Sequence, residues 1–191
     1  MKQAQFSQDA RDKTFGLRTS ADLLDKLKWE LDQAQRKSGR IEEAYFGANA
    51  ALTAHHTLDW IACEIVENEK CSFADAELGL GLTGKPSIAD VRKALQKFAA
   101  AANKWMHVFQ QTADAVKHRD LHFYSPTVGS HSIKPDEDEA TRLRTFVTFE
   151  GREPDGIWGI YGGGIYFVGM DVHVWLSTLI DRLGLRPERA T

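Results

Sequence analysis

Apolar side chains recur at helical spacing through the first two thirds of the chain, and polar capping patterns mark where helices begin. A run of leucines follows a Thr19-x-x-Asp22 pattern and stops at Ser38-Gly39. Since the threonine hydroxyl and the aspartate can satisfy the free N–H groups of a first helical turn, this run predicts a helix over 20–37.

Three more helical segments follow in the same part of the chain. An alanine-rich stretch predicts a long central helix over 41–69, and one helical turn is expected near 73–78. A second capping pattern, Ser87-x-x-Asp90, begins a periodic run of about 35 residues, which exceeds the usual length of a globular helix. We therefore expect a break near Asn103.

The spacing changes after a proline-containing, acidic stretch at 123–140, which is typical of an exposed loop. Residues 143–150 alternate between apolar and polar, as strands do, and two apolar runs flank the glycines at 162–164 like the arms of a hairpin. Asp171 is placed to cap a last helix whose apolar face needs a surface to pack on. These patterns predict a three-stranded antiparallel sheet followed by a helix.

Together these elements predict an α+β protein: mainly a helical bundle of about four helices, with a small C-terminal antiparallel β-sheet and a terminal helix. The expected organisation is an N-terminal arm at 1–18, the bundle at 19–122, a loop at 123–140, and the sheet and last helix at 141–191, packed on the bundle.

Composition narrows the class of protein. The chain has 191 residues, 42% of them hydrophobic and 27% charged, with a net charge of -3. This acidic balance argues against broad binding of a phosphate backbone and leaves a local basic groove as the remaining route. The polar first residues, the absence of a long apolar run, and two cysteines without zinc-type spacing predict a cytoplasmic protein with reduced thiols and no membrane contact.

Asp59 is the most conspicuous candidate for chemistry. It falls among apolar residues on one stripe of the predicted central helix, where a charge needs a partner or a purpose. The stripe consists of Ile41, Tyr45, Ala48, Leu52, Cys63 and Val66.

Lys117, on a later predicted helix, lies close enough to its apolar stripe to reach Asp59 across the bundle. With His56 and His118 beside this pair, the four residues form a candidate catalytic acid/base cluster, because imidazoles exchange protons near neutral pH. Two alternatives remain open. Asp59 can be a purely structural polar latch between helices, and His118 an ordinary histidine at a solvated helix end.

The histidines also permit a metal site. His118 and His122 are spaced i,i+4 and project from one helix face, so His55 or His56, together with Asp59, can complete a ligand set for zinc, nickel or iron. The leading interpretation needs no cofactor, and the alternative needs a divalent metal.

The loop Gly79–Lys85 matches a dinucleotide fingerprint and nearly matches a P-loop. A phosphate cradle needs a strand leading in and a helix starting at the lysine, whereas here a helix leads in and Pro86 occupies the Ser/Thr position. We therefore predict no nucleotide at this loop.

Two sequence segments resemble motifs in a group of bacterial and phage proteins. One is the alanine-rich segment that ends in His56-Thr57-Leu58-Asp59-Trp60; the other is Ala113-Asp114-Ala115-Val116-Lys117-His118, with Asp114 where that group has asparagine. The resemblance covers about residues 40–122 and extends to the HEPN superfamily of helical bundles. It implies a homodimer and an RNA or protein partner in a ribonuclease or toxin–antitoxin setting.

The chain departs from active HEPN nucleases at one position. Those enzymes carry an arginine four to six residues before the histidine that aligns with His118, and Ala113 stands there. Lys117-x4-His122 imitates the spacing but lacks the bidentate guanidinium. The resemblance thus predicts an interaction or regulatory module, RNA-directed or defence-related. The histidine outline also resembles DinB-like metal-dependent enzymes, which is the alternative function.

Overall fold

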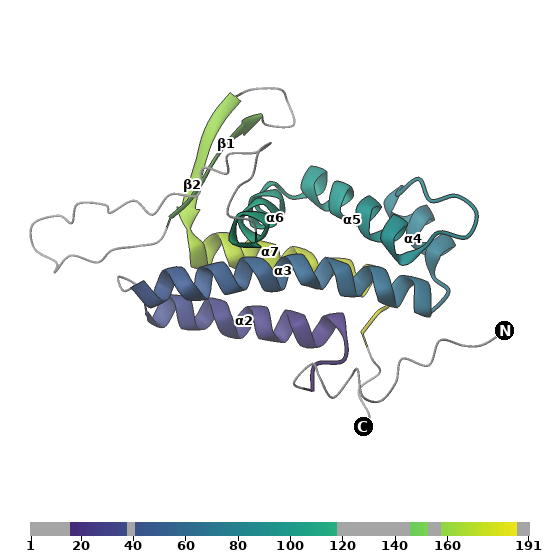
Figure 1. The fold of residues 1–191 in the computed structure, drawn as a ribbon, viewed down its shortest axis with the longest axis horizontal. Helices are drawn as coiled ribbons and strands as arrows, with labels where there is room; N and C mark the ends of the chain where they lie inside the picture. The colour runs from purple at the N-terminus through teal and green to yellow at the C-terminus, as the bar shows by residue number, and fades with distance from the viewer. Residues whose placement is uncertain (1–15, 38–40, 118–145, 153–157, 187–191) are drawn as a thin grey trace, which may run out of the picture.

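The computed structural model describes residues 16–37, 41–117, 146–152 and 158–186. These residues form mainly helices (Figure 1). In chain order the elements are α2 (Ser20–Arg36), α3 (Ile41–Glu67), α4 (Cys71–Leu78), α5 (Ile88–Ala102), α6 (Lys104–Lys117), β1 (Phe146–Arg152), β2 (Trp158–Gly164) and α7 (Ile165–Arg182).

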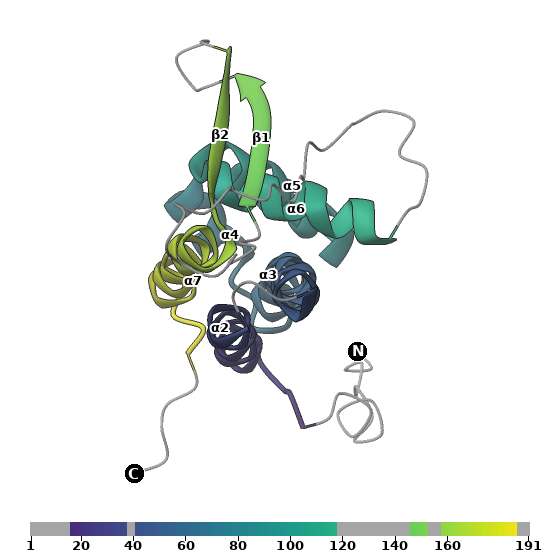
Figure 2. The same ribbon diagram turned by 90° about the vertical axis from the view of Figure 1, so that its left-hand side faces the viewer.

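Helix α3 is the central element of the fold. It contacts α2, α5, α6 and α7, and the end-on view shows α2, α3 and α7 in a triangle with α5 and α6 across one side (Figure 2). The core between these helices is mainly aliphatic, with Met106 and Phe109 also fully buried. Its largest fully buried members include Leu27, Leu31, Leu58, Ile61, Ile65, Leu95, Phe109, Leu176 and Ile180.

The predicted α+β class is wrong, because the described part of the chain is mostly helical and contains six helices instead of about four. No three-stranded sheet packs on the bundle there. The backbone of 146–152 and 158–164 pairs only as a two-stranded antiparallel ribbon, in which Gly164 lies opposite Phe146. A ribbon of this size adds no layer to the fold.

The predicted hairpin around the glycines at 162–164 is also wrong. Ile165 begins α7 directly after these glycines, so the terminal helix starts six residues before the expected cap at Asp171. Ile165, Val168 and Val172 are buried, at the i, i+3, i+7 spacing of a helix. Over so few apolar residues, strand and helix spacing cannot be told apart from sequence.

The other helical predictions agree with the structure. Both capping boxes form, and α5 ends one residue before Asn103, whose extended backbone separates it from α6. The Asn103 side chain also begins the next helix, since its Oδ1 accepts the Met106 N–H at 2.8 Å. The predicted loop at 123–140 and most of the predicted arm at 1–18 lie outside the described residues.

Two glycines allow α7 to approach its neighbours closely. A Cβ atom on Gly169 would lie 2.2 Å from a terminal methyl of Leu31 in α2, and one on Gly47 in α3 would lie 2.9 Å from Ile165. Both distances are shorter than van der Waals contact, so the helix axes are as close as they are because no side chain intervenes.

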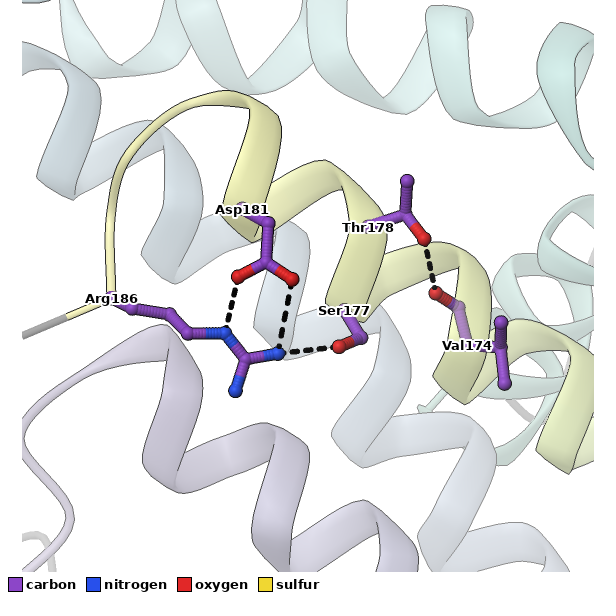
Figure 3. Close-up of polar contacts among 5 residues, drawn as sticks. All are labelled: Val174, Ser177, Thr178, Asp181 and Arg186. Atoms are coloured by element: carbon purple, nitrogen blue, oxygen red, sulfur yellow. Dashed lines mark hydrogen bonds and ion pairs between the residues drawn. The ribbon is translucent and has the colours of Figure 1, made fainter.

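The C-terminal end of α7 is closed by polar contacts. Arg186 folds back onto the helix, where its guanidinium binds Asp181 and donates to the Ser177 hydroxyl (Figure 3). The Lys70 ammonium donates to the carbonyls of Leu183 at 2.9 Å and Gly184 at 2.6 Å. Lys70 thus supplies donors to backbone carbonyls at the end of the helix, where the helix itself offers none. No helix among the described residues is long and apolar enough to cross a bilayer.

Candidate binding site on helices α3 and α5

Asp59 lies at the side of the buried face of α3, not in its centre. The predicted apolar stripe is wrong: Tyr45 is 61% exposed, and the rest of the stripe with a described side chain is only partly buried. The face that enters the core is rotated and combines alanines with large aliphatic residues: Ala50, Ala51, Ala54, Leu58, Ile61, Ala62 and Ile65. The Asp59 side chain keeps 23% of its surface exposed, so it needs no full desolvation.

The described partners of Asp59 come from α5. Arg92 Nε lies 3.2 Å from Asp59 Oδ1, and Gln96 Nε2 donates to the same oxygen at 3.3 Å. The Arg92 side chain is 45% exposed, so this ion pair is screened by water and contributes little to stability. Asp59 thus links the central helix to α5 while the Arg92 side chain stays partly exposed.

His55 belongs to the same polar group. Its Nε2 lies 3.4 Å from Gln96 Nε2, within a side chain that is almost fully buried. If the amide donates here, the neutral imidazole carries its hydrogen on Nδ1. Gln110 of α6 donates to the Gln96 carbonyl at 3.1 Å, so three helices meet in this network. We call His55, Asp59, Arg92 and Gln96 the α3–α5 polar cluster.

The other predicted site residues are only partly described. His56 is exposed and lies edge-on to His55, with ring centroids 6.1 Å apart. The Lys117 side chain, His118 and His122 lie outside the described residues, as therefore does the predicted Asp59–Lys117 pair. Within the described part of the chain no group of three or more His, Cys, Asp or Glu side chains could hold a metal ion. The acid/base and metal interpretations stay predictions.

Sequence reasoning missed Arg92 and Gln96, and it missed the charge pattern of α5. Arg92, Lys93 and Lys97 are all exposed on this helix, and Lys85 is exposed just before it. We call these four residues the basic face of α5. The sequence does contain this charge pattern, because residues 92, 93 and 97 fall on one side of the helix that follows the Ser87 cap.

Burial raises the pKa of two groups near this site, Cys63 and Glu64. Burial, followed by the negative charge of Glu67, raises the pKa of the Cys63 thiol, which keeps it protonated and unreactive at neutral pH. Burial also raises the pKa of Glu64, although the Ser20 N–H and hydroxyl both donate to this carboxylate at 2.6 Å. Glu64 therefore serves to hold the start of α2 against α3.

No protein-family model matches the chain, and neither a curated protein nor a solved structure is similar to it at a significant level.

Proposed function

We propose that this chain is a HEPN-like interaction or regulatory module that binds single-stranded RNA across the basic face of α5. The observation that carries the proposal is the clustering of exposed Lys85, Arg92, Lys93 and Lys97 on a chain whose net charge is -3. Such a local excess of positive charge attracts a phosphate backbone even where the whole molecule is acidic.

The neighbouring charges favour this use of α5. Asp90 is the one acid within α5, and its carboxylate is engaged by Ser87, whose N–H and hydroxyl donate to it at 2.9 and 2.7 Å. Asp59 holds Arg92 at one atom, which orients the guanidinium without covering it. The exposed face of the helix therefore stays positive.

Ala113 supports binding over RNA cleavage. It occupies the position at which active HEPN nucleases have arginine, and its own side chain is fully buried in the core. An arginine there would place a guanidinium among apolar neighbours, at a large cost in desolvation. The proposed role accordingly requires no reaction.

Fluorescence anisotropy with a labelled single-stranded RNA bearing a 5′-hydroxyl tests this proposal. The double variant K93E/K97E is expected to weaken binding by about tenfold or more, since two favourable phosphate contacts become repulsive. The matched control R36E/K37E makes the same charge change at the end of α2, on another part of the bundle, and should retain most of the affinity (Figure 1). Equal losses in both variants, or no measurable RNA binding by the wild-type chain, would refute the proposal.

Salt provides a second measurement for the same face. Four basic residues that contact phosphates of a single strand predict that log K falls with log salt concentration at a slope of about -3. The K93E/K97E variant should show a clearly shallower slope. A slope near zero for the wild-type chain would contradict backbone contact.

A second candidate role, a structural latch, is favoured for the α3–α5 polar cluster itself. Asp59 receives two donors from α5 and so fixes the position of that helix on α3. In this role Asp59 positions Arg92, and with it the basic face of α5, without itself touching RNA. The two roles are compatible, and the Asp59 variant described in the Discussion separates them.

A further inference from the structure

A cavity of about 460 Å³ opens between the glycine-rich loop and α5. The loop wall contains Leu80, Leu82, Thr83 and Lys85, and the helix wall contains Asp90, Lys93, Ala94 and Lys97. A volume of this size is within the range of pockets that hold small ligands. Its lining combines positive charge with apolar surface.

The loop wall is a defined structure. Gly79, Gly81 and Gly84 all have φ between 64 and 71°, a left-handed conformation that favours glycine, and a Cβ on any of them would meet no atom within 4 Å. The Leu82 N–H donates to Asp75 Oδ1 of α4 at 2.8 Å. The glycines thus set the path of the loop, and Asp75 secures it beside the cavity.

The charges in the cavity are those of an anion site. Lys85, Lys93 and Lys97 are all exposed, and, after the hydrogen bonds from Ser87, the charge of Lys93 also lowers the pKa of the nearby Asp90 carboxylate. Asp90 opposes them, but its carboxylate is turned to the Ser87 capping box, whose hydrogen bonds lower the pKa of Asp90 and keep it charged. Three lysines and one aspartate leave a formal charge of +2.

We infer that this cavity binds a terminal phosphomonoester. Such a group carries about -1.5 to -2 charges at pH 7 and three acceptor oxygens, which complements three lysines and a threonine hydroxyl. The apolar side chains of Leu80, Leu82 and Ala94 would then face the sugar or base that carries the phosphate. The inference goes beyond RNA binding along α5, because a free mononucleotide presents the same chemistry as the 5′ end of an RNA.

This pocket differs from the nucleotide cradle that the sequence argued against. A P-loop holds phosphates with backbone N–H groups of the loop itself, and no such arrangement is required here. The positive charge comes from side chains, two of them on the exposed side of α5. A nucleotide phosphate in this pocket departs from the prediction of no nucleotide at the loop Gly79–Lys85, which was based on the missing P-loop context alone.

The test compares two RNAs of one sequence, with a 5′-phosphate and with a 5′-hydroxyl, and adds a nucleoside 5′-monophosphate as a competitor. The 5′-phosphate should tighten binding by about fivefold to tenfold, as charge-assisted hydrogen bonds do. Lys85→Ala should bring this ratio close to one, and it should also weaken binding of the 5′-hydroxyl RNA by about threefold, because Lys85 belongs to the basic face of α5 and contributes one phosphate contact there. Lys104→Ala, an exposed lysine outside the cavity, should preserve the ratio.

The outcomes identify the source of the phosphate. If RNA fails to bind in either form but the mononucleotide binds in a Lys85-dependent way, by calorimetry, the pocket stands and the RNA proposal falls. If both RNAs bind equally well and the mononucleotide does not bind, the RNA proposal stands and the pocket is refuted. A 5′-phosphate effect that survives Lys85→Ala would also overturn the assignment.

Discussion

A single substitution at Asp59 can test how α5 is held on α3, because both of its described partners, Arg92 and Gln96, come from α5. Removing its charge by Asp59→Asn takes away the ion pair with Arg92, and an amide oxygen can still accept from Gln96. Since the pair is partly exposed, we expect a loss of roughly 0.5–1 kcal/mol in the free energy of unfolding, measured by chemical denaturation. RNA affinity should rise a fewfold at the same time, because Arg92 is freed from a neighbouring negative charge.

Asp181→Asn is the matched control for that change. It also removes a carboxylate paired with an arginine, Arg186, but at the end of α7 (Figure 3). A similar small loss of stability with unchanged RNA affinity is expected. If Asp59→Asn instead abolished RNA binding in a folded protein, Asp59 would be a direct contact and the latch role would be wrong.

His173 gives the chain a dependence of stability on pH. Burial lowers the pKa of this imidazole, and the nearby Lys28 ammonium lowers it further. The folded protein therefore binds this proton less well than the unfolded chain, whose histidines titrate near pH 6.5, so stability is lost as the pH falls below about 6.5. His173→Asn should lose less unfolding free energy between pH 7.5 and 5.5 than the wild type does.

Denaturation curves of both proteins at the two pH values check this. Burial also lowers the pKa of His107, which is still present in the variant, so the dependence should shrink and not vanish. Identical pH dependence in the two proteins would show that His173 does not contribute.

At the scale of elements, the packing of α7 on α2 depends on one glycine. Gly169→Ala would place a methyl group 2.2 Å from a fully buried Leu31 methyl and within 3.1 Å of its Cγ, so the whole isobutyl group or the helix must move. We expect a loss of about 1–3 kcal/mol, the usual cost of overpacking a core. Thermal and chemical denaturation measure it.

Gly164→Ala, at the cap position directly before the same helix, supplies the control. Its Cβ would lie 3.6 Å from Phe167, an ordinary contact, so its effect should be much smaller. The double variant Leu31→Ala with Gly169→Ala should lose less free energy of unfolding than the two single variants lose together, because the smaller side chain at position 31 relieves the clash. Full additivity would place the strain elsewhere.

Much of the element structure could be predicted from the sequence, for identifiable reasons. Capping boxes at Thr19 and Ser87, and the length argument for a break at Asn103, are local signals that the structure confirms. The start of α7 was misplaced because its first apolar residues fit strand and helix spacing equally well. The buried face of α3 differs from the predicted stripe because four of its seven buried apolar residues are alanines, which give a weak hydrophobic signal in a sequence. The alanines enter the core since four helices crowd that face.

At the scale of the whole molecule, the contacts of Asp59 could not be predicted, because they depend on how helices cross. Spacing indicates which residues share a face, but it does not say which helix lies opposite. The sequence pointed to Lys117 from α6, whereas the described partners come from α5. The basic face of α5 could have been predicted from the spacing of its lysines and arginine. The net charge of -3 does not reveal it, because a total says nothing about how charges are distributed over the surface.

The shallow attachment of α5 has a consequence for motion. Only Val91, Leu95 and Ala99 of this helix are buried, Phe98 packs partly buried against the core, and polar contacts to α3 and α6 add to the attachment. We therefore expect α5 to open locally, exchanging its amide hydrogens for deuterium faster than α2 and α3, which contribute more residues to the core. A ligand that binds only the closed helix must slow this exchange in proportion to its occupancy, so a phosphorylated RNA would protect α5 selectively. Protection that rose equally in α2 would mean that the ligand stabilises the bundle as a unit.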